Sequence, residues 1–234
     1  MADVGNLKAE EDRIRRAYAR RRDDGRYAIS DVANLLRIQD IERRLLRLLD
    51  QHGALPLRDK HILEIGCGTG YWLREFMKWG ADPAAVGGVD LLADRVAAAR
   101  RLCASGSWLL RSNAACLPFP DAEFDLVAQF TVFTSILDGQ LKRRVAQEMV
   151  RVLKPRGLVL WYDFQVANPR NPDVQGVGRR EIADLFPACS IWLQRVTLAP
   201  PIARLAAPLS WRLCTLLDTI PVLRTHYLGL IQKP

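Results

Sequence analysis

The sequence predicts an α/β fold: a doubly wound, mostly parallel, seven-stranded sheet with an N-terminal helical extension. Three observations support this prediction. Short apolar runs alternate with helical segments from residue 61 onward, which is the pattern of a parallel sheet covered by helices. A glycine-rich turn follows the first apolar run. The length of 234 residues and the hydrophobic fraction of 49% suit one domain with a buried core.

The expected elements follow from hydrophobic periodicity and from turn residues. Helices are predicted at 71–79, 93–102, 141–152, 179–186 and 202–217. A turn is expected at Pro155-Arg156-Gly157. The seven strands are predicted at 61–65, 85–90, 108–111, 124–130, 158–162, 190–197 and 226–231.

Residues 1–58 are predicted to form a helical cap, and residues 59–234 the main domain, with a helical insertion near 199–224. His52-Gly53 and Pro56 end the last helix of the cap. The cap and the insertion, with Tyr27 among their residues, are the expected lid over the site. The helix before His52 is predicted from apolar residues at helical spacing, namely Leu35, Leu36, Ile38, Ile41, Leu45, Leu46, Leu48 and Leu49.

Charge and cysteine content narrow the class of protein. The net charge is +8, but the densest arginine run, within residues 13–22, is flanked by acidic residues at 10–12 and 23–24, which favours a solvated helix face over a nucleic-acid contact. Five scattered cysteines without CxxC spacing indicate free thiols, and no metal site is predicted. No secretory signal and no apolar run of about 18 residues is visible, so the expected location is the cytoplasm.

The segment Glu64-Ile65-Gly66-Cys67-Gly68-Thr69-Gly70 predicts the binding site. Glycines at alternate positions allow a sharp turn and a close approach of the backbone to a ligand. Such a turn lies at the carboxyl end of the first strand, where open α/β sheets bind ligands. The dinucleotide fingerprint is GxGxxG, whereas the spacing here is GxGxG, with Tyr71 at the position of the third glycine of that fingerprint.

The glycine segment resembles the first motif of class I S-adenosylmethionine-dependent methyltransferases, (D/E)xGxGxG. Asp90 ends the second predicted strand about twenty residues later, where a carboxylate can accept hydrogen bonds from ribose hydroxyls. The segment from Asn113 to Val127 resembles the family's DAxxLPFPDxxFDLV, with Asn113 in place of the acidic residue beside the adenine amine. Residues 151–157 resemble its RVLKPGG turn, with Arg156 in place of the first glycine.

The resemblance covers roughly residues 60 to 165 and implies S-adenosylmethionine as the cofactor. The cofactor contacts that it implies are Glu64, Gly66, Cys67, Gly68, Gly70, Asp90, Leu91, Asn113, Ala114 and Gln129.

The sequence says less about the residues that bind the methyl acceptor than about those that bind the cofactor. Methyl transfer mainly requires that acceptor and methyl be held in line and that water be excluded, and a base is needed only where the acceptor loses a proton. The candidate bases are Asp163 at the end of the fifth strand and His226 at the start of the last, with Asp138 as a further candidate. The residues that could line the acceptor pocket are Thr131, Thr134 and Ser135, for which helix capping is the alternative.

Four hypotheses remain open at this stage. The first is methylation of a small-molecule acceptor, at an oxygen of a metabolite or glycan-type substrate. The second is C- or O-methylation of a lipid-like or quinone-like ring, which the apolar segment 199–224 favours. The third is a non-catalytic S-adenosylmethionine-binding protein, and the fourth a nicotinamide-dependent oxidoreductase, which the glycine spacing disfavours. The lack of an NPPY motif after the fourth strand argues against base methylation. A peripheral contact with a membrane surface is left open, as is the oligomeric state.

Overall fold

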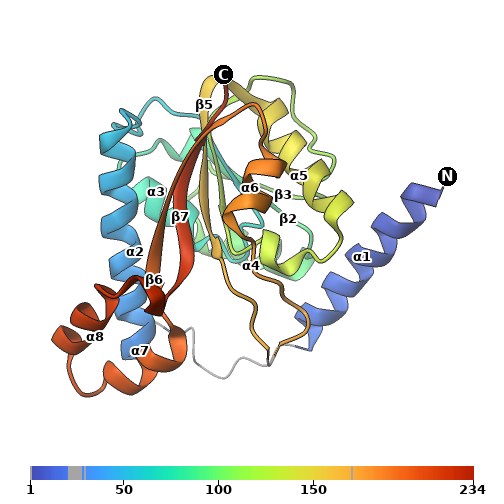
Figure 1. Ribbon diagram of the computed structural model, residues 1–234. Coiled ribbons are helices and arrows are strands. Elements are labelled where there is room, and N and C mark those ends of the chain that lie inside the picture. Colours follow the sequence, from blue (N-terminus) through green and yellow to red (C-terminus); the bar gives the residue numbers. More distant parts are fainter. Residues whose placement is uncertain (1, 21–27, 29, 170) are drawn as a thin grey trace.

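The computed structural model describes residues 2–20, 28, 30–169 and 171–234. Its centre is one seven-stranded sheet in the order β3-β2-β1-β4-β5-β7-β6 (Figure 1). All pairings are parallel except those of β7 with β5 and with β6. The doubly wound fold predicted from the sequence is therefore confirmed. The strands are β1 (Ile62–Ile65), β2 (Val86–Asp90), β3 (Trp108–Arg111), β4 (Phe124–Phe130), β5 (Leu153–Phe164), β6 (Ser190–Leu198) and β7 (Arg224–Gln232).

Helices cover both faces of the sheet. One face packs against α2 (Val32–Gln51), α3 (Tyr71–Lys78) and α4 (Ala93–Leu102) in one apolar cluster. The other packs against α5 (Gly139–Val152) and α6 (Arg179–Leu185) in a second cluster. Strand residues alternate between these clusters, with Ile62 in the first and Leu63 in the second, because successive side chains of a strand point to opposite faces.

The N-terminal helices differ in how they attach. The amphipathic face of α2 buries Ile38, Ile41, Leu45 and Leu48, and most of these residues belong to the main core. The other helix, α1 (Ala2–Ala19), lies along the outside of the molecule (Figure 1). Tyr27, which the sequence placed in a lid, lies outside the described residues. The division at residue 58 stays a prediction.

Two segments differ from the sequence-based expectation. The predicted helix 202–217 is two short helices, α7 (Pro200–Ala206) and α8 (Trp211–Asp218), because Pro208 cannot continue a helix and Ser210 caps the next one. Strand β5 begins at Leu153 and so includes the predicted turn. Arg156 nevertheless adopts a left-handed φ of 63° there.

Two further features matter for the site. The order of the sheet reverses between β1 and β4, and open α/β sheets bind ligands in the crevice at the carboxyl ends of such neighbouring strands. Among the described helices, none is long and apolar enough to cross a membrane.

Candidate active site at the carboxyl edge of the sheet

The glycine turn that follows β1 is a left-handed loop. Gly66, Gly68 and Gly70 have φ values of 64°, 54° and 75°, a region that glycine enters without steric cost. A Cβ at Gly66 would lie 2.6 Å from Val132 Cγ2, and one at Gly70 would lie 2.4 Å from Cys103 Sγ. A Cβ at Gly68 would meet no atom within 4 Å. Gly66 and Gly70 are therefore required by packing, whereas Gly68 faces open space.

The carboxylate of Asp90 lies beside this open backbone. Its Oδ2 accepts a hydrogen bond from Gly68 N at 2.9 Å, and its Oδ1 accepts one from Leu92 N at 2.8 Å. Burial raises the pKa of Asp90, and these two backbone bonds oppose the rise. Each carboxylate oxygen can accept a second bond, so Asp90 can still bind hydroxyl groups. Leu91, which follows it, is half-buried.

Glu64 supports the loop from within the sheet. Glu64 is 2% exposed, and the backbone of Leu73 in the first turn of α3 opposes the rise in its pKa. Gly70, the N-cap of α3, has no side chain that could cap the helix. Burial raises the pKa of Glu64 well above its usual value, and Oε2 has no hydrogen-bond partner. The acidic residue of the motif is thus buried beneath the first turn of α3 in this conformation.

Cys67 and Gln129 also act from the interior. Cys67 is buried, and its amide donates to Val89 O at 3.0 Å, which joins the loop to β2. Gln129 is fully buried, and its Oε1 accepts from Val132 N at 3.0 Å. The sequence predicts both residues as cofactor contacts. In the structure they fix the backbone around Gly68, where an added Cβ would meet no atom within 4 Å.

Asn113 lies after β3 and is half-buried. Its Oδ1 accepts from Ala115 N at 2.8 Å, and its Nδ2 donates to Glu11 Oε1 of α1. Ala114 packs at the edge of the second apolar cluster. The Asn113 oxygen retains one lone pair for the predicted contact with an amine.

Comparisons with known proteins agree with this geometry. Residues 62–157 match the family model described as "Methyltransferase domain". Residues 62–157 therefore form a methyltransferase domain. The matched range runs from β1 into the turn at the start of β5, so it includes the glycine loop, Asp90 and Asn113.

Individual relatives support the same family. The demethylmenaquinone methyltransferase of Lactiplantibacillus plantarum is 36% identical over 122 residues, 50% of this chain and 49% of that protein. The fatty-acid O-methyltransferase of Mycolicibacterium smegmatis is 36% identical over 116 residues, 47% of this chain and 38% of that protein. The chain thus spans about half or less of the length of these curated relatives.

The fold is shared with solved structures at low sequence identity. A SAM-dependent methyltransferase from Methanosarcina mazei superposes with a TM-score of 0.58 at 18% identity, covering 79% of this chain and 96% of that one. At this identity the similarity shows the fold alone.

The residues that the sequence predicts to line the acceptor pocket lie in the turn after β4. Thr131 has a left-handed φ of 59° and donates from Oγ1 to Phe130 O at 2.7 Å. Thr134 is 2% exposed, and its Oγ1 donates to Asp163 Oδ1 at 2.7 Å. The Ser135 hydroxyl is 3.2 Å from Tyr18 of α1. Of the three predicted lining residues, Thr131 alone is more than slightly exposed.

Asp163 is a buried structural acceptor in this conformation. It is 0% exposed. One carboxylate oxygen accepts from Thr134 Oγ1 and from Phe164 N, and the other accepts from Thr134 N at 3.2 Å. Burial raises the pKa of Asp163 to about 7, against the lowering effect of these bonds. The sequence placed it as a base facing the acceptor, and the geometry does not support that role.

His226 is also enclosed. It is 2% exposed, stacks on Tyr162 with ring centroids 4.7 Å apart, and lies 3.8 Å from the Phe164 ring. Its Nδ1 is 3.0 Å from Thr225 Oγ1. Burial lowers the pKa of His226 well below its usual value, and the charge of Arg37 adds to the effect. Because the imidazole is enclosed in this conformation, it does not match the predicted base. The third candidate, Asp138, caps α5 by accepting from Leu141 N at 2.7 Å.

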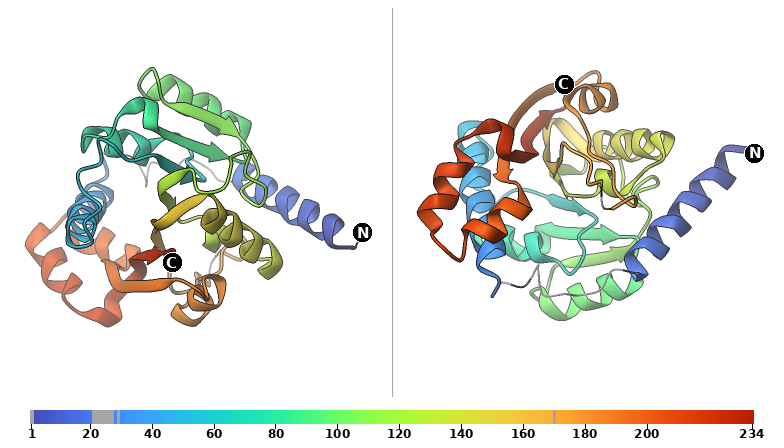
Figure 2. Two further views of the ribbon diagram at one scale, coloured as in Figure 1. Left: turned by 90° about the horizontal axis from the view of Figure 1, so that it is seen from above. Right: turned by 60° about the horizontal axis from the view of Figure 1, so that its bottom comes forward.

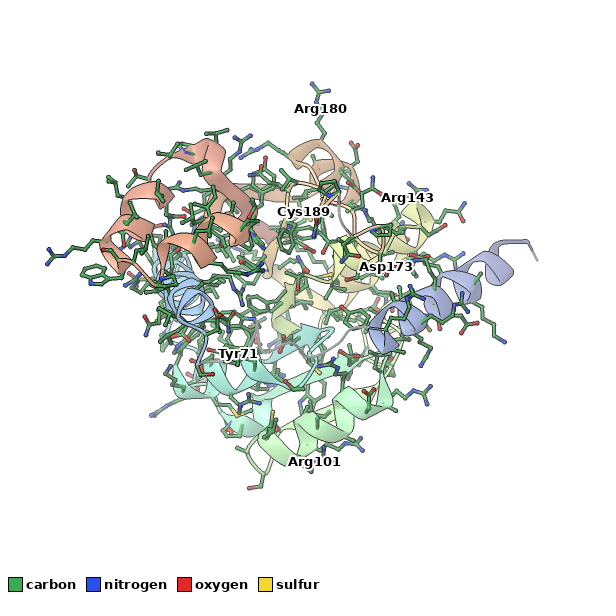
Figure 3. All side chains as sticks on the ribbon, turned by 90° about the horizontal axis from the view of Figure 1, so that it is seen from below. Tyr71, Arg101, Arg143, Asp173, Arg180 and Cys189 are labelled. Atoms are coloured by element: carbon green, nitrogen blue, oxygen red, sulfur yellow. The ribbon has the colours of Figure 1, made fainter. Side chains whose placement is uncertain are left out.

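Sequence reasoning missed the contribution of α1. Glu10 Oε1 accepts from Leu137 N at 2.6 Å, and Arg13 donates to Ser135 O at 2.6 Å. Arg20 pairs with Asp173 at 3.1 Å, and Asp173 lies beside α1 in the view from below (Figure 3). The helix is therefore fastened to the turn after β4 and to the segment after β5. These contacts join residues more than 100 positions apart in the sequence. No local sequence pattern predicts such contacts.

Arg37 of α2 was also missed. It is half-buried and donates to Asn34 Oδ1 at 2.7 Å, and its charge opposes the rise that burial causes in the pKa of Tyr162. Its charge also acts on Tyr71, which follows the glycine loop. Among the described residues no carboxylate forms an ion pair with it. Arg37 therefore brings a positive charge to the boundary between the glycine loop and β5.

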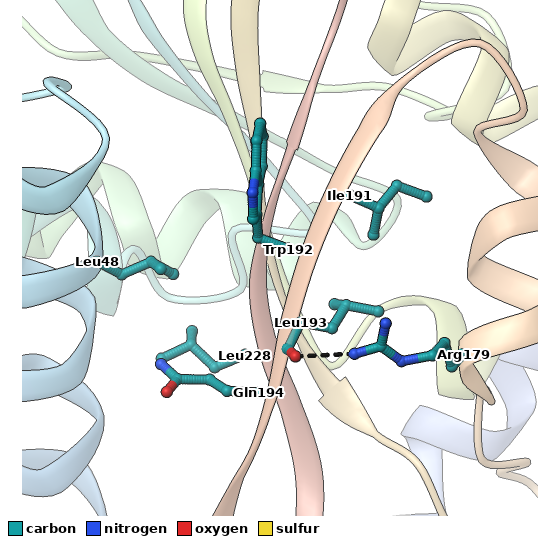
Figure 4. Close-up of a pocket in the computed structure, with 7 residues that line it drawn as sticks. All are labelled: Leu48, Arg179, Ile191, Trp192, Leu193, Gln194 and Leu228. Carbon is teal, nitrogen blue, oxygen red and sulfur yellow. Dashed lines mark hydrogen bonds between the residues drawn. The ribbon is translucent and has the colours of Figure 1, made fainter.

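The pocket shown in Figure 4 lies elsewhere. It is formed at the outer strand β6, by residues that include Leu48, Arg179, Trp192 and Leu228. Arg179 donates to Leu193 O at 3.0 Å across it. None of the predicted site residues lines this pocket, so the candidate active site rests on the glycine loop and its neighbours.

Proposed function

We propose that the whole protein transfers the methyl group of S-adenosylmethionine to a small-molecule acceptor bound at the carboxyl edge of the sheet. The observation that supports this most directly is the pairing of Gly68 with Asp90. Gly68 has open space where a Cβ would stand, and the adjacent carboxylate retains acceptor capacity. Backbone that can be approached closely beside a free acceptor suits a ribose with two hydroxyl groups.

The residues present fit this cofactor. Gly66, Gly68, Gly70, Asp90 and Asn113 would hold it, while Glu64, Cys67 and Gln129 fix the backbone around it. The cofactor, when bound, supplies an activated methyl group on a sulfonium. The chain's part is to orient the acceptor and exclude water.

We assign the acceptor side to the turn at 131–135, with Arg37 and Tyr71 as its neighbours. Asp163 is a positioning residue in this proposal: it accepts hydrogen bonds from both the amide and the hydroxyl of Thr134, and thereby fixes the turn. The acceptor is expected to be methylated at an oxygen of a metabolite or glycan-type molecule.

A second candidate acceptor is a lipid-like or quinone-like molecule. Two observations favour it. The relatives named above act, by their names, on demethylmenaquinone and on fatty acids. Large apolar side chains are also exposed near the same edge of the sheet, on the segment between β6 and β7.

The test is transfer of radiolabelled methyl from S-adenosylmethionine into a cell extract, followed by partition into organic and aqueous phases. Label in the aqueous small-molecule fraction supports the first acceptor class, and label in the organic phase supports the second. No label in either phase, with S-adenosylhomocysteine bound by the same preparation, would contradict methyl transfer and leave a binding protein.

A further inference from the structure

The segment that joins β6 to β7 forms a small lobe of its own. Residues 199–223, here called the C-terminal lobe, comprise α7, α8 and the 3-10 turn η3 (Pro221–Leu223). Ala206, Ala207 and Cys214 form its small interior together with Leu198 and with Leu36 of α2. The lobe is therefore attached to the body through one side.

The other side of the lobe exposes large apolar side chains. Of the eleven such side chains that are exposed in the described part of the chain, six belong to these 25 residues. A soluble surface normally exposes such side chains singly. The six side chains and their exposed fractions are Leu205 (76%), Leu209 (78%), Trp211 (60%), Leu216 (64%), Ile220 (42%) and Val222 (80%).

The charges on this outer side are all positive. Arg204 and Arg212 are exposed, neither forms an ion pair with a described residue, and the Arg212 guanidinium lies 5.6 Å from the centre of the Trp211 ring. The lobe's one carboxylate, Asp218, is bound by Arg44 at 2.6 Å and lies 3.6 Å from Arg224, with its side chain 14% exposed. The outer side therefore combines leucine, tryptophan and arginine with no exposed acid.

The direction of the strands places the lobe at the edge of the active site. Because β7 is antiparallel to both β5 and β6, β6 runs in the same direction as β5, and its end at Leu198 lies at the carboxyl edge of the sheet. The lobe follows directly. Figure 2 shows α7 and α8 on the side of this edge opposite α1.

We propose that the C-terminal lobe docks on the surface of an anionic phospholipid bilayer. Apolar side chains enter the boundary between headgroups and acyl chains, tryptophan prefers that boundary, and arginines pair with anionic headgroups. A second copy of the chain is a poorer occupant, because a symmetric contact would set Arg204 and Arg212 against their own copies without an acid to neutralise them. This inference is independent of the proposed reaction.

The test is co-sedimentation of the full chain with vesicles of phosphatidylcholine alone and with added phosphatidylglycerol. The wild-type protein is expected to bind the anionic vesicles, and to bind less as salt is raised. Arg204→Gln combined with Arg212→Gln should weaken that binding about 30-fold. Leu205→Ser combined with Leu209→Ser should weaken binding to both kinds of vesicle.

The matched control is Arg101→Gln combined with Leu102→Ser. Both residues are exposed, Leu102 to 55%, and both lie at the end of α4. Arg101 is at the opposite edge of the picture from α7 and α8 (Figure 3). This variant should bind vesicles as the wild type does. All variants should retain affinity for S-adenosylhomocysteine, which reports an intact fold. Equal vesicle binding by the lobe and control variants would overturn the proposal, as would a dimer in sedimentation that only the lobe variants abolish.

Discussion

The two halves of the sheet present polar residues at the same edge in opposite ways. At the ends of β1 and β2, Gly68 faces open space and Asp90 keeps free acceptor capacity. At the end of β5 and the start of β7, Asp163 and His226 are enclosed and already have partners. A position at the carboxyl edge therefore brings a residue near the proposed binding site but does not make it reactive. A residue there can contact a ligand only if its side chain or backbone is exposed, and an enclosed residue has a structural role instead.

The comparison predicts the largest effect for Asp90→Asn. The variant loses the charge on the carboxylate beside the glycine loop. A hydrogen bond to a charged group contributes about 1.5–3 kcal/mol, so affinity for S-adenosylhomocysteine should fall about 10- to 150-fold. Isothermal titration calorimetry measures it. Asp82→Asn is the control, because Asp82 also caps a backbone amide, that of Ala84, but at an exposed turn. Unchanged affinity in Asp90→Asn would show that the ends of β1 and β2 do not bind the cofactor through this carboxylate.

Asp163→Asn should change the pH dependence of stability. Burial raises the pKa of Asp163 to about 7, so the folded state holds this proton more tightly than the unfolded chain does. The stabilisation is complete below the unfolded pKa of about 3.9 and is lost as pH rises through about 7. The free energy of unfolding of the wild type, relative to the variant, should therefore decrease between about pH 4 and about pH 7, as measured by urea unfolding.

The same variant tests the positioning role. If Asp163 only fixes the turn at Thr134, methyl transfer should be reduced without a new dependence on pH. Complete loss of transfer, with stability and cofactor affinity retained, would make Asp163 the base and would contradict the comparison.

His226→Gln is expected to have the smallest effect on transfer. Burial lowers the pKa of His226 well below its usual value, so the folded protein binds this proton less readily than the unfolded chain. Its contribution to stability is present above the unfolded pKa of about 6.5 and is lost as pH falls through the folded pKa. The variant should therefore lose less stability on acidification than the wild type, in the same unfolding assay. A large fall in kcat at neutral pH would instead show that His226 is catalytic.

Local patterns predicted most of the fold. The strands β3 and β4 and the helix α4 begin and end where periodicity placed them. The misses have physical causes. Pro208 divides the predicted helix 202–217. Pairing of Leu153 with Phe124 of β4 extends β5 back beyond the left-handed Arg156.

The site was predictable to the extent that backbone geometry determines it. The glycine spacing and the distance to Asp90 are local in sequence, and the structure brings them together through one hydrogen bond. Burial of Asp163 by Thr134 and of His226 by Tyr162 depends on contacts between distant segments. The docking of Glu10 on Leu137 does so as well, and a single sequence gives no local signal for such contacts.

If a ligand approaches the backbone at Gly68, the comparison of Gly68→Ala with Gly53→Ala should reveal it. Both glycines have positive φ, 54° and 64°, and neither has an atom within 4 Å of an added Cβ. Both variants should therefore lose about 1–2 kcal/mol of stability from backbone strain alone. The measurement is affinity for S-adenosylhomocysteine by calorimetry. We expect Gly53→Ala to bind as the wild type does and Gly68→Ala to bind at least about tenfold more weakly, since a tenfold change corresponds to about 1.4 kcal/mol. Equal, wild-type affinity in both variants would contradict the account.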